Sequence, residues 1–123
     1  MVISMTPKHI KQNDIWMVDM GVDGIVGHEQ KGTRPFYVIS NTEYNTFSKT
    51  PIGFFLSTSE KKKENRFTVD VDMQGKSENV NTSQIRTISS ERFMRYMGHG
   101  SDEETKLLLE TFEREVIKIG KES

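Results

Sequence analysis

The sequence contains no cysteine. This absence excludes a disulfide framework, a thiolate nucleophile and a cysteine-ligated zinc site. Long apolar runs are missing too: nowhere do about 18 apolar residues follow one another, and the first residues form too short an apolar stretch for a secretory signal. We therefore expect a cytoplasmic protein that binds no membrane. The length of 123 residues is that of one domain, and we expect residues 1–123 to form it.

Motifs for metal and nucleotide chemistry are also absent. The three histidines include no pair at metal-ligand spacing, and the Gly-x-Ser-x-Gly sequence of serine hydrolases does not occur. Segment 21–32 lacks the Gly-Lys-Ser/Thr ending of a phosphate-binding loop. Charge is nearly balanced, with 17 Lys and Arg against 18 Asp and Glu, which weighs against an extended non-specific nucleic-acid binder. We expect no metal and no cofactor.

The sequence does contain a series of short runs rich in aromatic and β-branched residues. Such runs, some of them alternating with polar residues, are typical of strands. A glycine-containing loop over 21–35, a turn over Asn41–Asn45 and a polar hairpin tip over Lys61–Asn65 separate them. Five strands are predicted, at 14–20, 36–39, 51–57, 67–72 and, with a weaker pattern, 80–88.

The periodicity changes after residue 100. Ser101 and Glu104 form the Ser-x-x-Glu sequence of a capping box that opens a helix. Gly120 is suited to end this helix, and residues 90–97 are predicted to form a shorter one. Helical spacing predicts an apolar face made of Leu109, Phe112, Val116 and Ile119. Strands followed by helices predict an α+β fold, mainly β, in which a small antiparallel barrel or curled sheet has helices at its end.

Residues 27–35 read Gly-His-Glu-Gln-Lys-Gly-Thr-Arg-Pro and follow the strand predicted at 14–20. This order of residues resembles the signature of the MazF/PemK/Kid toxin family, and the residues themselves are most similar to those of the PemK/Kid branch. Other members carry Ser in place of His28. Two further stretches, 38–41 with Asn45 and 84–88, resemble the family's second strand and turn and its last strand. The likeness spans residues 13–92.

The resemblance implies a fold and a reaction. The fold is an SH3-like barrel of the CcdB/MazF/Kid kind, assembled as a homodimer. The reaction is the sequence-specific, metal-independent cleavage of single-stranded mRNA by an endoribonuclease toxin of a type II toxin-antitoxin system. Attack by the 2′-hydroxyl of the RNA leaves a 2′,3′-cyclic phosphate and a 5′-hydroxyl. The resemblance also implies an antitoxin of the MazE/PemI kind as the cognate partner.

Four residues are candidates for catalysis. The guanidinium of Arg34 offers a fixed fork of donors that matches phosphate oxygens and stays protonated, and the family carries a catalytic arginine here. Ser57 lies where MazF-type members have a catalytic threonine, and Thr58 is the alternative hydroxyl donor. A histidine is suited to proton transfer near neutral pH, which makes His28 a candidate. Glu29 is able to accept a proton or to orient the guanidinium.

One departure from the family affects the proton-transfer groups. Kid-type members carry Arg-x-Asp directly before the glutamine of the last motif, where this chain has Asn81 and Ser83 before Gln84. The acid/base pair proposed for Kid therefore does not carry over. Two alternatives stay open: a MazF-like arginine and serine do the work with help from His28 or Glu29, or the activity is weak.

Polar side chains around these motifs are candidates for contacts with base edges or phosphates of an unpaired strand. They are Gln30, Lys31, Thr33, Asn45, Thr58, Ser83 and Gln84. Phe47 is a candidate for stacking on a base, provided that its ring is exposed.

Two non-catalytic alternatives belong to the same fold. A CcdB-like gyrase poison relies on a tryptophan near its C-terminus, whereas this chain has its only Trp at position 16 and ends Gly120-Lys121-Glu122-Ser123. The other alternative is a toxin fold that has lost catalysis and binds RNA, which the residues Asn81 and Ser83 favour.

Overall fold

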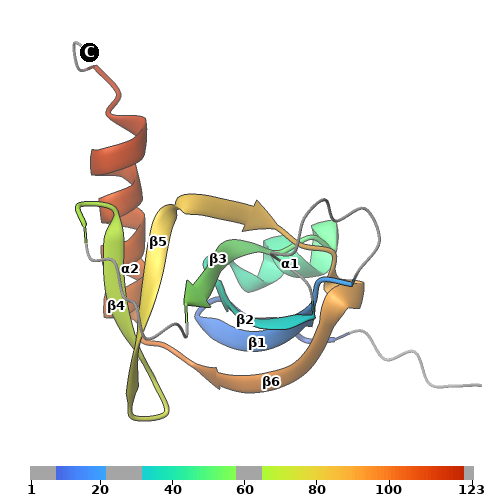
Figure 1. Ribbon diagram of the computed structural model, residues 1–123. Helices are drawn as coiled ribbons and strands as arrows, with labels where there is room; N and C mark the ends of the chain where they lie inside the picture. The colour runs from blue at the N-terminus through green and yellow to red at the C-terminus, as the bar shows by residue number, and fades with distance from the viewer. Residues whose placement is uncertain (1–7, 22–31, 58–64, 121–123) are drawn as a thin grey trace, which may run out of the picture.

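The computed structural model describes residues 8–21, 32–57 and 65–120 (Figure 1). Within these ranges six strands form one antiparallel sheet in the order β4-β5-β3-β2-β1-β6. The strands are β1 (Asp14–Asp19), β2 (Thr33–Val38), β3 (Ile52–Ser57), β4 (Thr68–Met73), β5 (Lys76–Thr87) and β6 (Phe93–His99). The helices are α1 (Thr42–Ser48), the 3-10 turn η1 (Ser90–Arg92), α2 (Asp102–Phe112) and the π-helical turn η2 (Glu113–Ile117). Among the described residues, none of the helices combines the length and the apolar composition that a membrane span needs.

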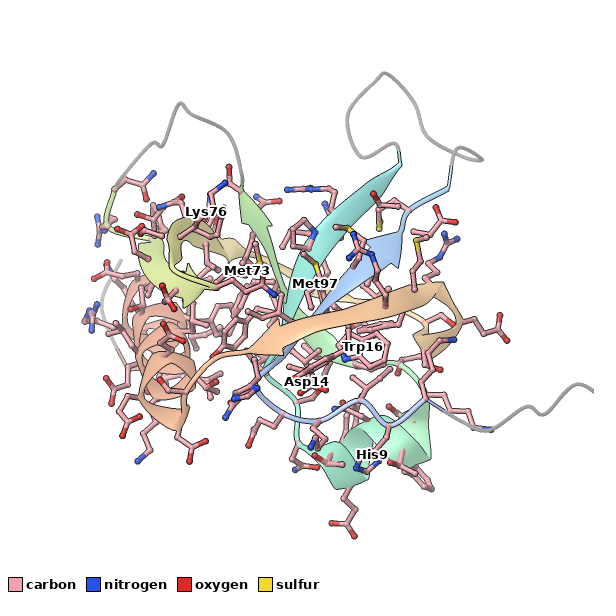
Figure 2. The ribbon with its side chains drawn as sticks, turned by 90° about the horizontal axis from the view of Figure 1, so that it is seen from below. His9, Asp14, Trp16, Met73, Lys76 and Met97 are labelled. Atoms are coloured by element: carbon pink, nitrogen blue, oxygen red, sulfur yellow. The ribbon has the colours of Figure 1, made fainter. Side chains whose placement is uncertain are left out.

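The sheet curls until its two outer strands approach each other, which confirms the predicted small antiparallel barrel with helices. Figure 1 shows β5 and β6 curving around the inner strands from opposite sides. At the turn between β4 and β5, Gln74 Nε2 donates a hydrogen bond of 2.6 Å to Met97 O on β6. Met73 and Met97 lie near this contact (Figure 2) and pack against the same apolar cluster.

Two apolar clusters fill the two sides of the inner strands. Successive side chains of a strand point to opposite faces. Phe54 accordingly joins a cluster with Tyr37 and Leu108 of α2, while its neighbour Phe55 joins a second cluster with Phe36. The strands β2 and β3 are therefore buried on both faces and form the rigid centre of the fold.

The sixth strand corrects one sequence prediction. The sequence predicts a short helix over residues 90–97, but Ser90–Arg92 form only a 3-10 turn and Phe93–His99 form β6. Phe93 is buried, and the Trp16 ring of β1 contacts it edge-on at a centroid distance of 5.9 Å. Pairing with the open edge of β1 and burial of Phe93 outweigh the local helical pattern.

The short helix lies elsewhere, at α1, in the segment predicted as a turn. Asn41 Oδ1 accepts a hydrogen bond of 2.7 Å from Tyr44 N, so the turn-prone Asn41 is the N-cap of this helix. Asparagine favours both chain reversals and helix caps because its short side chain binds nearby backbone N–H groups, and the sequence alone does not separate these two roles.

The C-terminal helix begins as predicted but buries a different face. The capping box of Ser101 and Glu104 is present, with reciprocal hydrogen bonds of 3.0 and 3.1 Å. The buried residues of α2 are Thr105, Leu108 and Thr111. Of the predicted apolar face, Phe112 packs against the core, whereas Leu109, Val116 and Ile119 are exposed. The Tyr37 and Thr105 hydroxyls lie 2.8 Å apart in a hydrogen bond. This polar contact holds the Thr105 face of α2 against the sheet, and the spacing of apolar residues does not reveal it. The helix ends at Phe112 and continues as the π turn, short of Gly120.

Gly53 allows β3 to lie close to β2. A Cβ atom at this position would lie 1.9 Å from Tyr37 O and 2.9 Å from the ring of Phe36. Only a residue without a side chain fits between these strands.

Replacement Gly53→Ala is expected to lower the free energy of unfolding by about 3 kcal/mol, because the strands must move apart to admit the methyl group. Urea unfolding followed by Trp16 fluorescence measures the change. Thr87→Ala, on an exposed part of β5, is the control and should stay within about 0.5 kcal/mol of the parent. A parental midpoint for Gly53→Ala would contradict the close packing of β3 on β2.

Candidate functional site

A cavity of about 140 Å³ opens on one face of the three strands β2, β3 and β5. Its lining comes from segments that are far apart in the sequence. The lining residues are Arg34, Phe55, Ser57, Asn79, Asn81, Gln84 and Arg86.

Cross-strand pairing explains why residues of β3 and β5 meet there. Ser57 pairs with Asn79, and Gly53 pairs with Arg86. Phe55 lies between Gly53 and Ser57 on the same face, because side chains alternate along a strand. The ring of Phe55 therefore forms the apolar floor of the cavity. Ser57 and its partner Asn79 lie at one end of this floor, and Arg86 lies at the other.

A bulge in β5 brings additional residues over this floor. Phe54 pairs with Ile85 and Leu56 with Val80, so two steps along β3 correspond to five along β5. The surplus residues of β5 bend the strand, as bulges do. Asn81 and Gln84 consequently both line the cavity, although they would point to opposite faces of a regular strand.

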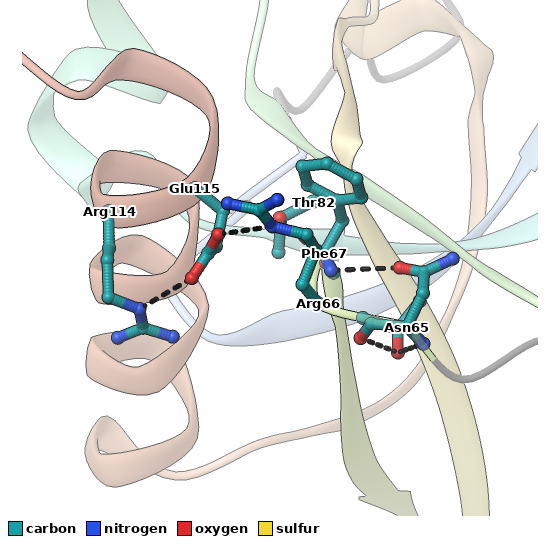
Figure 3. Close-up of polar contacts among 7 residues, drawn as sticks. Asn65, Arg66, Phe67, Thr82, Arg114 and Glu115 are labelled. Carbon is teal, nitrogen blue, oxygen red and sulfur yellow. Dashed lines mark hydrogen bonds and ion pairs between the residues drawn. The ribbon is translucent and has the colours of Figure 1, made fainter. Parts of the chain in front are cut away.

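Side-chain hydrogen bonds hold the bulge in shape. The backbone N and the Oγ1 of Thr82, which is fully buried, donate to Phe67 O at 2.9 and 2.8 Å. Figure 3 shows Thr82 beside Phe67. On the cavity side, the N and Oγ of Ser83 both donate to Asn81 Oδ1, at 3.0 and 2.7 Å. The positions of Asn81 and Gln84 are therefore determined by the bulge.

Arg34 is placed over the floor by an aromatic contact. Its Cζ lies 4.4 Å from the centroid of the Phe55 ring, which is a cation–π geometry. Burial lowers the pKa of Arg34, and the nearby positive charge of Arg86 lowers it further. The guanidinium remains charged at any physiological pH because its ordinary pKa is so high.

The chemistry of the lining favours an anionic ligand. Besides Phe55, the described lining consists of two guanidinium groups, one hydroxyl and three side-chain amides, with no carboxylate or imidazole. The Nδ2 of Asn79 donates to Asp70 Oδ1 at 3.3 Å, and Asp70 itself does not line the cavity. Such a set of donors binds and polarises a phosphate or another oxyanion.

The structure brings together three of the residues predicted from the sequence. Arg34, Ser57 and Gln84 line one cavity. Thr33 is exposed at the start of β2, beside Arg34, and Ser83 is exposed on the bulge. The candidates His28, Glu29, Gln30, Lys31 and Thr58 lie outside the described residues.

Two further candidates lie away from the cavity. Asn45 is only 4% exposed. Its Nδ2 donates to Ile10 O at 3.0 Å and to Ser40 O at 3.1 Å, and its Oδ1 accepts from Ser40 Oγ, so its amide holds the loop after β2 together. The Phe47 ring on α1 is 87% exposed, as base stacking would require, but it does not line the cavity.

Sequence reasoning missed four lining residues as members of the site: Phe55, Asn79, Asn81 and Arg86. The sequence does contain a signal for Arg86, because this residue follows Gln84 by two positions and therefore lies on the same face of the strand. Asn81 stands out in the sequence only as a departure from the Kid-type pattern, since a bulge in β5 leaves no clear signal there.

Comparisons with known proteins identify the family of this chain. The chain matches the family of the PemK-like, MazF-like toxin of type II toxin-antitoxin system over residues 11–115. It is 31% identical over 98 residues to the endoribonuclease EndoA of Bacillus subtilis (strain 168), a match that covers 76% of this chain and 83% of EndoA.

Solved structures show the same fold. The crystal structure of MazF (Form-I) from Deinococcus radiodurans superimposes with a TM-score of 0.71 at 17% identity, covering 87% of this chain and 96% of MazF. An endoribonuclease in complex with its cognate antitoxin from Mycobacterial species superimposes with a TM-score of 0.68 at 15% identity, covering 85% of this chain and 92% of that endoribonuclease. The match to the family over most of the chain and the likeness to EndoA establish that this chain belongs to the PemK-like, MazF-like toxins of type II toxin-antitoxin systems.

Proposed function

We propose that the protein is a sequence-specific, metal-independent endoribonuclease toxin that cleaves single-stranded mRNA. The observation that carries the proposal is the cavity in which Arg34 lies over Phe55 and Ser57 lines the same face. The sequence resemblance places these residues where the family has its catalytic arginine and threonine, and EndoA is described as an endoribonuclease.

The proposed reaction is an internal transesterification. The 2′-oxygen forms a bond to phosphorus while the bond from phosphorus to the 5′-oxygen breaks. The proton of the 2′-hydroxyl passes to a base, and the leaving 5′-oxygen gains a proton. The products are a 2′,3′-cyclic phosphate and a 5′-hydroxyl, and no atom changes its oxidation state.

Within this reaction Arg34 stabilises charge. Partial burial and the aromatic ring beneath it shield the guanidinium from water, which strengthens its attraction to an oxyanion. The hydroxyl of Ser57 donates a hydrogen bond to the scissile phosphate. His28 and Glu29 remain the proposed proton-transfer groups, because no carboxylate or imidazole belongs to the described lining of the cavity.

RNA recognition is assigned to polar residues around the cavity. Gln84 and Ser83 present an amide and a hydroxyl on the bulge, and Thr33 adds a hydroxyl beside Arg34. Gln30, Lys31 and Thr58 complete the proposed set. We further propose a cytoplasmic homodimer that is held inactive by an antitoxin of the MazE/PemI kind, because one solved relative is described with its cognate antitoxin.

A binding-only function is the second candidate. Asn81 and Ser83 stand where Kid-type toxins carry the Arg-x-Asp pair, and in this structure their side chains bind each other. If the remaining groups transfer protons poorly, the protein would bind RNA tightly and yield little product.

Arg34→Ala is expected to lower the cleavage rate by about 10³-fold, because it removes the guanidinium that lies over Phe55. Purified protein is incubated with a long unstructured RNA in EDTA, and the fragment ends are mapped. Arg95→Ala on β6, outside the cavity lining, is the matched control and should cut like the parent. Near-parental cutting by Arg34→Ala would remove this residue from the catalytic set, and no cutting by the folded parent would favour the binding-only function.

Replacements of Ser57 test the hydroxyl donor. Ser57→Ala should slow cleavage by about 10²-fold, whereas Ser57→Thr keeps the hydroxyl and should retain most of the rate. Single-turnover rates on one cleavable oligonucleotide measure both. If neither replacement changes the rate, the assignment moves to Thr58.

A further inference from the structure

Arg86 brings a second guanidinium into the cavity, and the proposed cleavage by Arg34 and Ser57 gives it no role. It extends from β5, whereas Arg34 extends from β2, and these strands flank β3 on its two sides. Gly53 is the residue directly opposite Arg86, so the facing position offers no side chain that could cover the guanidinium. The two arginines therefore approach the Phe55 floor from opposite sides.

The charge of Arg86 has no carboxylate beside it in the described part of the chain. Elsewhere in these ranges, arginines do pair with an acid: Arg66 and Arg114 both bind Glu115, at 2.7 and 2.9 Å (Figure 3). The positive charge of Arg86 lies close enough to lower the pKa of Arg34. Two like charges around one cavity repel each other, and an anion bound between them relieves the repulsion.

We propose that Arg86 is a further catalytic residue, whose guanidinium binds the second non-bridging oxygen of the scissile phosphodiester across from Arg34. This assignment rests on the proposed ribonuclease function. A phosphodiester carries one negative charge, and the crowded phosphorane formed by attack of the 2′-oxygen carries a second. A cation on each side of the phosphorus therefore stabilises the transition state more than the bound substrate.

Arg86→Gln and Arg86→Lys test the assignment, with Arg95→Gln as the control that removes one positive charge outside the cavity. At saturating RNA, the single-turnover rate of Arg86→Gln should fall by about 10²-fold. Arg86→Lys keeps a point charge without the planar fork of donors. Its single-turnover rate should lie between the rates of Arg86→Gln and the parent. Arg95→Gln should cut at the parental rate. Thermal unfolding of each variant checks that the fold is intact.

Binding of an uncleavable 2′-deoxy oligonucleotide separates binding from catalysis. Arg86→Gln should weaken this binding by less than it slows cleavage, since the ground state carries less negative charge than the transition state. If Arg86→Gln cleaves saturating RNA at the parental single-turnover rate, the catalytic role is overturned, whether or not the variant binds the oligonucleotide more weakly. If the folded parent itself fails to cut, the ribonuclease proposal and the catalytic role of Arg86 fall together. A loss of oligonucleotide affinity in Arg86→Gln but not in Arg95→Gln would then leave Arg86 as a phosphodiester-binding residue only.

Discussion

The bulge in β5 is the constraint on which the site depends. Thr82 uses both its backbone N and its hydroxyl to bind Phe67 O, and this double contact turns the strand at the point where it leaves β4 and follows β3. Without the surplus residues, Asn81 and Gln84 would lie on opposite faces of the sheet. The bulge therefore creates the cavity wall, and the buried position of Thr82 makes that wall part of the core.

The rest of the fold makes the floor of this cavity rigid. Phe54 and Phe55 belong to two different apolar clusters, so β3 cannot tilt without disturbing packing on both of its sides. The close approach of β2 to Gly53 fixes the separation of the two strands. Arg34 consequently packs on the Phe55 ring, which the second apolar cluster holds in place. Its guanidinium therefore needs little rearrangement when an anion binds. Preorganisation of this kind is what electrostatic catalysis requires.

Features that follow from local patterns could be predicted from the sequence, and features that depend on tertiary pairing could not. The presence of five strands and the Ser101 capping box is correctly predicted, because alternation and capping are local, although β2 begins at Thr33, inside the segment predicted as a loop. The sixth strand was missed, since only the edge of β1 selects an extended conformation for residues 93–99. Arg34, Ser57 and Gln84 were identified through the family resemblance, and all three line the cavity. Arg86 and Asn81 emerged only with the register and bulge of β5.

The departure from the Kid-type pattern has a physical interpretation in this chain. Asn81 and Ser83 are bound to each other on the bulge, so these positions contribute to the shape of the cavity. The charge there comes instead from Arg34 and Arg86, which extend from the strands on either side of β3. Under the proposed function, these two cations stabilise the charge of the phosphorane, and His28 and Glu29 are the proposed proton-transfer groups. Two preorganised cations beside the scissile phosphate lower the barrier by stabilising the transition-state charge, whichever group then transfers the protons.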